Sequence, residues 1–291
     1  MRFKGMIIRP PSEADSYLLQ ITYGCSHNKC TFCPTYLDKK FGVRPVEEVF
    51  EDLQLASSSF PQTRRVFLCD GNALVLQNRR LLPILERIGL AFPNLQRVGI
   101  YANARDILKR SMGELEELRD KKLGLIYMGL ESGSEEILRR VKKGSTAREM
   151  IDSVKKAQRA GIKVSVIGLL GLGGKTLSHE HAVKTGKAVS EMDPLYFSLL
   201  SLMLVPGTEL HAEWERGEFE MPEPIELLEE MKEIIENLED LSGCIFRTNH
   251  ASNYLPLAGR LPRDKQKLIA IIDRAISQGE SALRPESWRG L

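Results

Sequence analysis

Short apolar runs alternate with longer amphipathic segments along the first two thirds of the chain. The runs at 125–128 and 164–167 are almost wholly apolar, which is typical of strands buried on both faces. The longer segments place apolar residues three and four positions apart, as amphipathic helices do. Strands are predicted at 17–22, 65–69, 95–101, 123–130, 163–170 and 196–205, and helices at 45–57, 79–88, 112–121, 146–160 and 178–190.

This alternation predicts an α/β fold, because neighbouring parallel strands need long connections that are usually helical. Six strand–helix units suit either a doubly wound sheet or an incomplete barrel, and periodicity alone does not choose between them. After Gly207 the alternation stops, and helices are expected at 224–241 and 263–278 with an irregular piece at 242–262. The domain prediction is therefore a core at 1–210 and a helical C-terminal extension at 211–291 that packs on it.

Composition and charge narrow the class of protein. Of the 291 residues, 42% are hydrophobic, which is enough for a large core. No apolar stretch approaches the ~20 residues of a membrane helix, and the N-terminus has no apolar signal region. We therefore expect a cytoplasmic protein with no membrane partner. The net charge of +2 disfavours nucleic acid as a partner.

Three of the five cysteines, Cys25, Cys30 and Cys33, follow the first predicted strand within nine positions. Thiols crowded on one loop in a reducing compartment are typical of a metal site. Three ligands leave one coordination position open, as in a reactive site, whereas His27 as a fourth ligand would make a closed zinc site. Two other cysteines are too few for a second cluster that needs four.

The cysteine loop resembles the cluster-binding loop of the radical S-adenosylmethionine (SAM) superfamily. It has the aromatic residue, Phe32, before the last cysteine, but its spacing, C-x4-C-x2-C, is one residue longer than the common one. The ends of later predicted strands resemble the superfamily as well. The last of them, Val205-Pro206-Gly207, is similar to the branch that includes oxygen-independent coproporphyrinogen oxidases.

The resemblance implies roles for residues at these strand ends. The Asp70-Gly71-Asn72 turn is similar to the segment that receives the SAM amino group, although the usual Gly-Gly-Glu is not intact. Glu131 and Ser132 match a segment near the ribose and methionine groups of SAM. The full set of implied cofactor-binding residues is Phe32, Asp70, Gly71, Asn72, Glu131, Ser132, Lys143, Gly168 and Val205.

The resemblance also implies a reaction and a partial (β/α)6 TIM-like barrel. Cys25, Cys30 and Cys33 would hold a [4Fe-4S] cluster whose fourth iron is chelated by SAM. Reductive cleavage of SAM would give a 5′-deoxyadenosyl radical that removes a hydrogen atom from substrate, in an oxygen-sensitive reaction. Flavodoxin or ferredoxin would supply the electron, and the residues favour a small-molecule substrate over a macromolecule.

Two other functions remain open at this point. One is a non-catalytic relative that binds the cluster, SAM or haem as a carrier or chaperone. The other is a zinc-binding nucleic-acid adaptor that uses three cysteines and His27. Neither the cysteine spacing nor the strand pattern excludes them.

The polar, non-helical run at 247–256 offers candidate catalytic residues. His250 and Tyr254 could line a substrate pocket, and a histidine can move a proton near neutral pH. A hydrogen-bonded turn that fastens the extension to the core explains the same residues equally simply. His179 and His181 are not a metal pair, because residues two apart on a helix point to different faces.

Overall fold

The computed structural model describes residues 2–290, which divide into two compact units. Each unit is built from several stretches of the chain, so both are described separately below. Among the described residues, the first unit comprises 2–28, 35–128 and 153–164, and the second comprises 29–34, 129–152 and 165–290.

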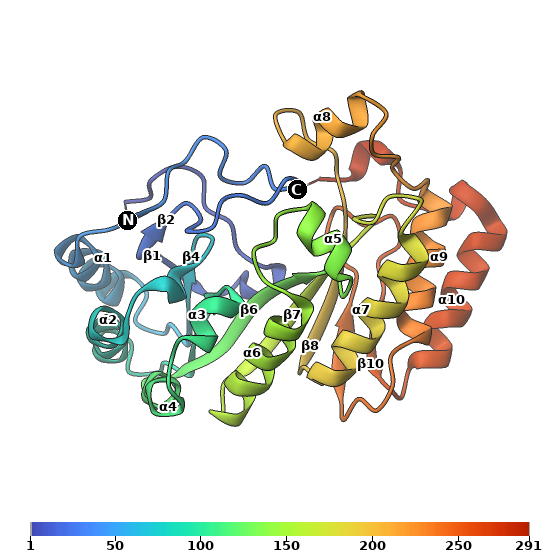
Figure 1. The fold of residues 1–291 in the computed structure, drawn as a ribbon. Helices are drawn as coiled ribbons and strands as arrows, with labels where there is room; N and C mark the ends of the chain where they lie inside the picture. The colour runs from blue at the N-terminus through green and yellow to red at the C-terminus, as the bar shows by residue number, and fades with distance from the viewer. Residues whose placement is uncertain (1, 291) are drawn as a thin grey trace. The chain divides into compact units, whose positions relative to one another are not determined.

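The first unit carries the N-terminal half of the sheet. Strands β1, β4, β5 and β6 are parallel neighbours in that order, and β2 pairs with β3 in a separate antiparallel ladder. Helices α1 and α2 pack on each other, as do α2 and α4 (Figure 1). The elements are β1 (Tyr17–Gln20), β2 (Thr22–Tyr23), β3 (Gly42–Val43), α1 (Val46–Ser59), β4 (Arg65–Cys69), α2 (Asn78–Ala91), β5 (Arg97–Tyr101), α3 (Ala104–Leu108), α4 (Met112–Asp120) and β6 (Leu123–Glu131).

Aromatic rings from three neighbouring strands pack together in the first unit. Phe67 makes edge contacts with Tyr101 and Tyr127, at centroid distances of 5.0 and 5.6 Å. The Tyr127 hydroxyl donates to the buried carboxylate of Glu13, which also pairs with Arg97 at 2.7 Å. The N-terminal segment is therefore tied to the strands by a charged side chain whose oxygens are satisfied, as burial requires.

The second unit carries the C-terminal half of the sheet. Strands β7, β8 and β9 are parallel, and β10 pairs with β9 in the antiparallel direction. Helices α7, α9 and α10 lie side by side (Figure 1). The elements are α5 (Glu135–Arg140), α6 (Ala147–Arg159), β7 (Lys163–Leu170), α7 (Ser178–Met192), β8 (Tyr196–Ser201), α8 (Glu209–Glu215), α9 (Pro224–Glu236), β9 (Cys244–Arg247), β10 (Ala258–Leu261) and α10 (Lys265–Gln278). Three elements cross the boundary between the units: α6 ends in the first unit, β7 begins in it, and β6 ends in the second.

The predicted α/β fold with parallel strands is confirmed in each unit: β1, β4, β5 and β6 are parallel in the first, and β7, β8 and β9 are parallel in the second. The bounds of β4 and β7 are those predicted from the apolar runs. The prediction that 242–262 is irregular is wrong, because β9 and β10 lie within this segment. Strands of four residues are too short for a period of two to stand out. Among residues 2–290, no helix is long and apolar enough to span a membrane.

Candidate functional site

The first cysteine lies against the turn that follows β4. A Cβ atom on Gly71 would come within 2.8 Å of both the Cys25 Cβ and the Tyr36 ring, so only glycine fits there. The Gly24 backbone N–H donates to Asp70 Oδ2 at 3.2 Å, one residue before the cysteine. The turn after β4 therefore fixes where the cysteine loop begins.

Asn72 extends this attachment to the next strand end. Its amide nitrogen lies 2.8 Å from the Ser26 hydroxyl and donates to Asp106 at 2.6 Å. Its amide oxygen accepts from the Asn103 backbone N–H, just beyond β5. The predicted Asp70-Gly71-Asn72 segment is thus brought together with Cys25 within the first unit.

Asp70 is fully buried and has an unusual charge environment. Its Oδ2 atom accepts from Gln20 and Gly24 and lies 3.4 Å from Lys39 Nζ, whereas its Oδ1 atom has no partner among the described residues. Burial raises the pKa of the Asp70 carboxyl, against the lowering effect of Gln20 and Lys39. A buried acceptor without a donor costs free energy, and a ligand could relieve that cost.

The other two cysteines lie in the second unit, on a turn closed by the Cys33 N–H and the Cys30 carbonyl at 3.2 Å. Backbone bonds join Thr31 between them to Val141 and Leu210. Phe32, expected to contact a cofactor, packs against an apolar cluster and so anchors the turn. That cluster consists of Ile137, Val141, Leu169, Leu172, Leu202, Leu210 and Phe219.

Glu131 ends β6 and pairs with Lys143 at 2.8 Å, with each side chain 14% exposed. The φ angle of Glu131 is +61°, in the left-handed region that residues with a side chain seldom adopt. A Cβ on Gly129 would overlap the Glu131 carboxylate at 1.9 Å. The two residues predicted to contact SAM are therefore adjacent, and glycine leaves room for their ion pair.

Gly168 and Val205 lie near the carboxyl ends of β7 and β8. A Cβ on Gly168 would approach the Leu199 side chain to 2.9 Å, so packing accounts for this glycine. Val205 is half-buried, and its carbonyl accepts from the backbone and hydroxyl of Thr208. Neither observation tests a role in cofactor binding.

The donor chemistry of the cysteines fits an iron–sulfur cluster. No disulfide joins any of the five cysteines, and Cys25, Cys30 and Cys33 are partly exposed. Burial raises the pKa of Cys69 strongly and that of Cys244 to about 12, so these two thiols are poor ligands. Within residues 2–290 no three His, Cys, Asp or Glu side chains already surround a common metal position.

Comparison with known proteins gives the family. The sequence profile of the Radical SAM superfamily matches residues 19–185, more than half of the chain. This chain belongs to the radical SAM superfamily. Its members are enzymes that use a [4Fe-4S] cluster and SAM, as the cysteine loop and strand ends predict.

Relatives within the superfamily are distant. A putative methylthiotransferase from Methanocaldococcus jannaschii is 24% identical over 64% of this chain and 42% of its own length. A tRNA uridine(34) acetyltransferase from Methanocaldococcus infernus is 24% identical over 72% of this chain and 47% of its own. The radical SAM chain described here therefore spans less than half the length of these curated relatives.

Solved structures confirm the partial barrel. Coproporphyrinogen III oxidase from Escherichia coli, a radical SAM enzyme, superposes with a TM-score of 0.56 at 17% identity, over 76% of this chain and 51% of that one. At this identity the likeness concerns the fold alone.

The two candidate catalytic residues of this radical SAM protein lie in a firmly held turn. His250 Nδ1 is 2.9 Å from the Ser252 hydroxyl, and burial, followed by the charge of Arg284, lowers the pKa of His250. Asn253 donates to the Leu199 carbonyl and accepts from the Ser201 hydroxyl at the end of β8. The turn is thus docked on the strand end.

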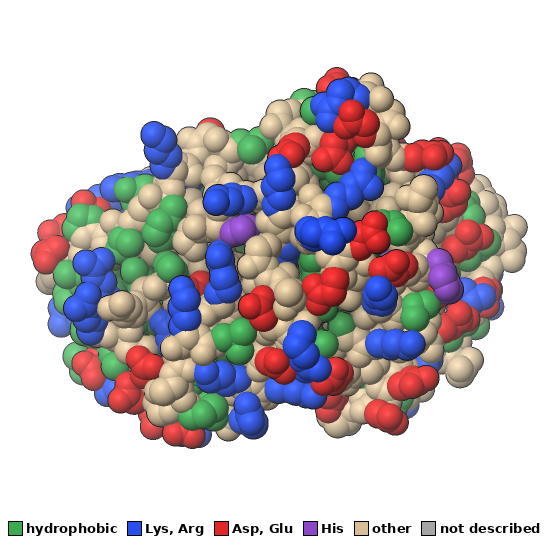
Figure 2. All heavy atoms as spheres, viewed as in Figure 1, with side chains coloured by type: hydrophobic (Ala, Val, Ile, Leu, Met, Phe, Trp, Pro, Cys, Tyr) green, Lys and Arg blue, Asp and Glu red, His purple; other side chains and the backbone are tan. Residues whose placement is uncertain are grey.

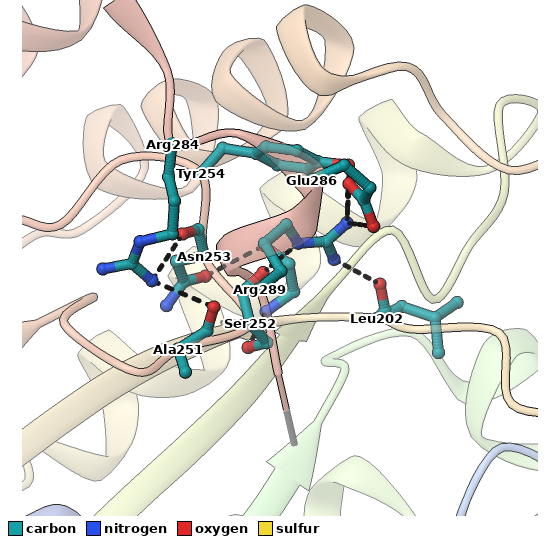
Figure 3. Close-up of polar contacts among 9 residues, drawn as sticks. Leu202, Ala251, Ser252, Asn253, Tyr254, Arg284, Glu286 and Arg289 are labelled. Carbon is teal, nitrogen blue, oxygen red and sulfur yellow. Dashed lines mark hydrogen bonds and ion pairs between the residues drawn. The ribbon is translucent and has the colours of Figure 1, made fainter.

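The C-terminal tail engages Tyr254 directly (Figure 3). Arg289 lies over the Tyr254 ring, 4.0 Å from its centroid, and donates to the Tyr254 hydroxyl and the carbonyls of Ser252 and Leu202. The Tyr254 hydroxyl also bonds Glu286, and burial raises its pKa to about 12. These contacts explain the polar run as a fastening device, and a catalytic role for His250 and Tyr254 remains a prediction.

Two residues were missed by sequence reasoning. The Asn103 side-chain nitrogen is buried without a partner among the described residues, two positions after β5. The signal that could have found it is its place at a strand end, where barrel enzymes carry reactive residues. His181, dismissed as a metal ligand, is fully buried and contacts Ser132.

Proposed function

We propose that this chain is a single-cluster radical SAM enzyme in which Cys25, Cys30 and Cys33 hold the [4Fe-4S] cluster. The observation that carries the proposal is that these three thiols are partly exposed on one loop, whereas Cys69 and Cys244 are buried. The three thiolates would hold the cluster and leave one iron for SAM. When bound, the cluster supplies the electron that cleaves SAM to methionine and a 5′-deoxyadenosyl radical, which takes a hydrogen atom from substrate.

The residues of the chain would bind and orient SAM. Asp70 Oδ1, which has no partner among residues 2–290, is an acceptor suited to the methionyl ammonium group, and the Asn103 amide nitrogen, which likewise has none there, is a donor suited to an oxygen of SAM. Glu131 would accept from ribose hydroxyls, and Lys143 would pair with the carboxylate once released from Glu131. The adjoining Ser132, Gly168 and Val205 complete the set that we assign to SAM.

We assign a small-molecule substrate and a one-electron donor such as flavodoxin or ferredoxin. Basic and acidic side chains both lie on the face drawn in Figure 2, and the net charge of +2 gives little overall attraction for a phosphate backbone. Because one relative is named for tRNA modification, tRNA is the second substrate class to test. Methylthio transfer, for which a relative is named, is not proposed for this chain. The two remaining thiols, Cys69 and Cys244, are buried and too few to hold a second cluster.

Anaerobic reconstitution tests the proposal. The protein should take up about four irons per chain and release 5′-deoxyadenosine from SAM when dithionite is added. Cys30→Ala should lose both properties. Cys244→Ala is the matched control, because it removes a thiol that is buried in β9, and it should keep the iron and the product.

The outcomes separate the alternative functions. Zinc without iron in the wild-type protein would favour the adaptor that uses His27, whose Nδ1 lies 3.2 Å from the Arg105 guanidinium in this structure. An intact cluster with bound SAM but no 5′-deoxyadenosine would favour a carrier or chaperone. A higher yield of 5′-deoxyadenosine with bulk tRNA would replace the small-molecule assignment.

A further inference from the structure

The chain turns back sharply at the carboxyl end of β6. The Ser132 N–H donates to the Leu130 carbonyl at 2.8 Å, which closes a three-residue turn around Glu131. With φ of +61° at Glu131, this is the rare and strained form of γ-turn. Such a conformation is energetically unfavourable and persists only where surrounding contacts hold it.

Helix α7 supplies those contacts. The Ser132 hydroxyl lies 2.8 Å from His181 Nδ1, within hydrogen-bond distance, and it also accepts from the Ser134 N–H. The Gly133 N–H donates to the Thr185 hydroxyl at 3.0 Å. The residues after the strained turn are therefore bonded to two side chains, one helical turn apart on α7.

His181 in turn faces Glu230 of α9. Its Nε2 atom lies 3.6 Å from Glu230 Oε1, and both side chains are fully buried. Burial lowers the pKa of His181, against the raising effects of the Glu230 charge and of a backbone contact with Leu169. Nε2 therefore faces the carboxylate just beyond hydrogen-bond distance, and it has no hydrogen-bond partner within 3.5 Å among the described residues.

The same carboxylate holds the end of β7. Glu230 Oε1 accepts from the Gly171 N–H at 2.7 Å, and Oε2 accepts from the Ser178 hydroxyl. Gly171 has φ of +82°, and a Cβ there would come within 2.9 Å of Leu227, also on α9. Glu230 of the C-terminal extension thus bonds the turn after β7 directly and lies next to His181, which contacts the turn after β6.

We propose that His181 and Glu230 are positioning residues that hold the strained turn at Glu131, and the turn at Gly171, in the geometry that binds SAM. This inference rests on the function proposed above. It assigns a task to the extension, since α9 would set the shape of a site on strands that precede it. Neither side chain would touch SAM.

Matched substitutions test the proposal on reconstituted protein, with SAM dissociation constants and thermal midpoints measured together. His181→Gln leaves an amide near Nε2 but nothing for Ser132, and Glu230→Ala releases Gly171. Each should weaken SAM binding by about 10-fold, the equivalent of one lost hydrogen bond. Glu230→Gln keeps an acceptor and should restore binding to within about 2-fold of wild type.

Lys232→Gln is the control on the same helix, because it breaks an ion pair with Asp273 on α10 and should leave SAM binding unchanged. The EPR spectrum of the reduced cluster should change on adding SAM in wild type and control, and less in His181→Gln at equal SAM concentration. Wild-type affinity in His181→Gln and Glu230→Ala, with lowered thermal midpoints, would show a merely structural pair and overturn the proposal.

A second variant keeps the test decisive if His181→Gln fails to fold. Glu230→Ala, which changes a residue on another helix that does not touch SAM, should still weaken SAM binding by about 10-fold; unchanged affinity in this variant would contradict the proposal. If wild-type protein with a full cluster binds no SAM, the proposed function itself is wrong. That outcome is distinct from wild-type binding with unaffected variants.

Discussion

Two acidic residues mark the ends of β4 and β6, and they differ in one instructive way. Asp70 directly follows β4 with φ of +71°, and Glu131 ends β6 with φ of +61°. Asp70 is fully buried, with one oxygen crowded by donors and the other without a partner among the described residues. Glu131 is partly exposed and is closed by Lys143. The same left-handed backbone conformation therefore presents two different carboxylates. Asp70 has an oxygen without a partner among the described residues, whereas Glu131 is already paired with Lys143.

This difference predicts which residue matters more for ligand affinity. A buried polar atom without a partner costs about 1–3 kcal/mol, and a ligand that donates to it recovers that cost. An ion pair near the surface contributes about 0–1 kcal/mol, and a ligand must first displace it. A ligand therefore gains more at Asp70 than at Glu131.

The largest effect is expected at the glycine beside Asp70. Gly71→Ala would place a methyl group 2.8 Å from the Cys25 Cβ, so the cysteine loop must move. Iron bound after reconstitution should fall about 10-fold, because metal sites tolerate little displacement of a ligand. Iron and sulfide analysis, with circular dichroism to confirm folding, measures the effect.

Gly113→Ala is the control for this prediction. Gly113 lies in α4 with nothing within 4 Å of the added methyl group, so the substitution should stabilise the protein by about 0.5–1 kcal/mol. Its iron content should equal that of wild type. A full cluster in folded Gly71→Ala would contradict the view that the turn after β4 fixes Cys25.

A smaller effect, with opposite signs for stability and affinity, is expected for Asp70→Asn. The folded-state pKa of Asp70 is raised above the ordinary value of 3.8, so the folded protein binds the proton more tightly than the unfolded chain does. The wild-type protein should therefore lose stability relative to Asp70→Asn as pH rises from about 4 through the folded-state pKa. SAM affinity should fall about 5-fold, because an amide nitrogen replaces the acceptor oxygen that had no partner among the described residues.

Urea unfolding of the apo protein between pH 4 and 7 measures the first effect, and titration with SAM measures the second. Asp120→Asn, at an acid whose side chain is 66% exposed, is the control. If the stability difference between wild type and Asp70→Asn does not vary with pH, Asp70 is not strained by burial. Unchanged SAM affinity would remove it from the binding site.

The positions of these residues could be predicted from sequence, whereas their partners could not. Apolar runs with sharp polar borders define β4 and β7, and the rule that reactive groups follow parallel strands then selects Asp70 and Glu131. The four-residue strands β9 and β10 carry too few positions to show a period.

Long-range contacts account for the rest of what was missed. Phe32 follows a familiar motif, yet its packing depends on an apolar cluster that extends to Phe219. His181 and Ser132 are 49 residues apart, and a helix face cannot reveal that a histidine on it reaches a strand end. Local pattern fixes elements and strand ends, while the identity of a buried partner depends on how the chain folds back.

The smallest effect is expected for Glu131, the acid that is paired with Lys143. A double-mutant cycle with Glu131→Gln and Lys143→Met should give a coupling free energy of about 0.5–1 kcal/mol, typical of a partly exposed pair, and salt should reduce it. Arg148 and Asp152, an exposed pair on α6, form the control cycle and should couple less. Glu131→Gln should weaken SAM binding less than Asp70→Asn does. In the wild-type protein SAM must displace the Glu131–Lys143 ion pair, whereas in Glu131→Gln that ion pair is already absent. A larger loss of SAM affinity in Glu131→Gln than in Asp70→Asn would reverse the comparison and make Glu131 the principal SAM contact.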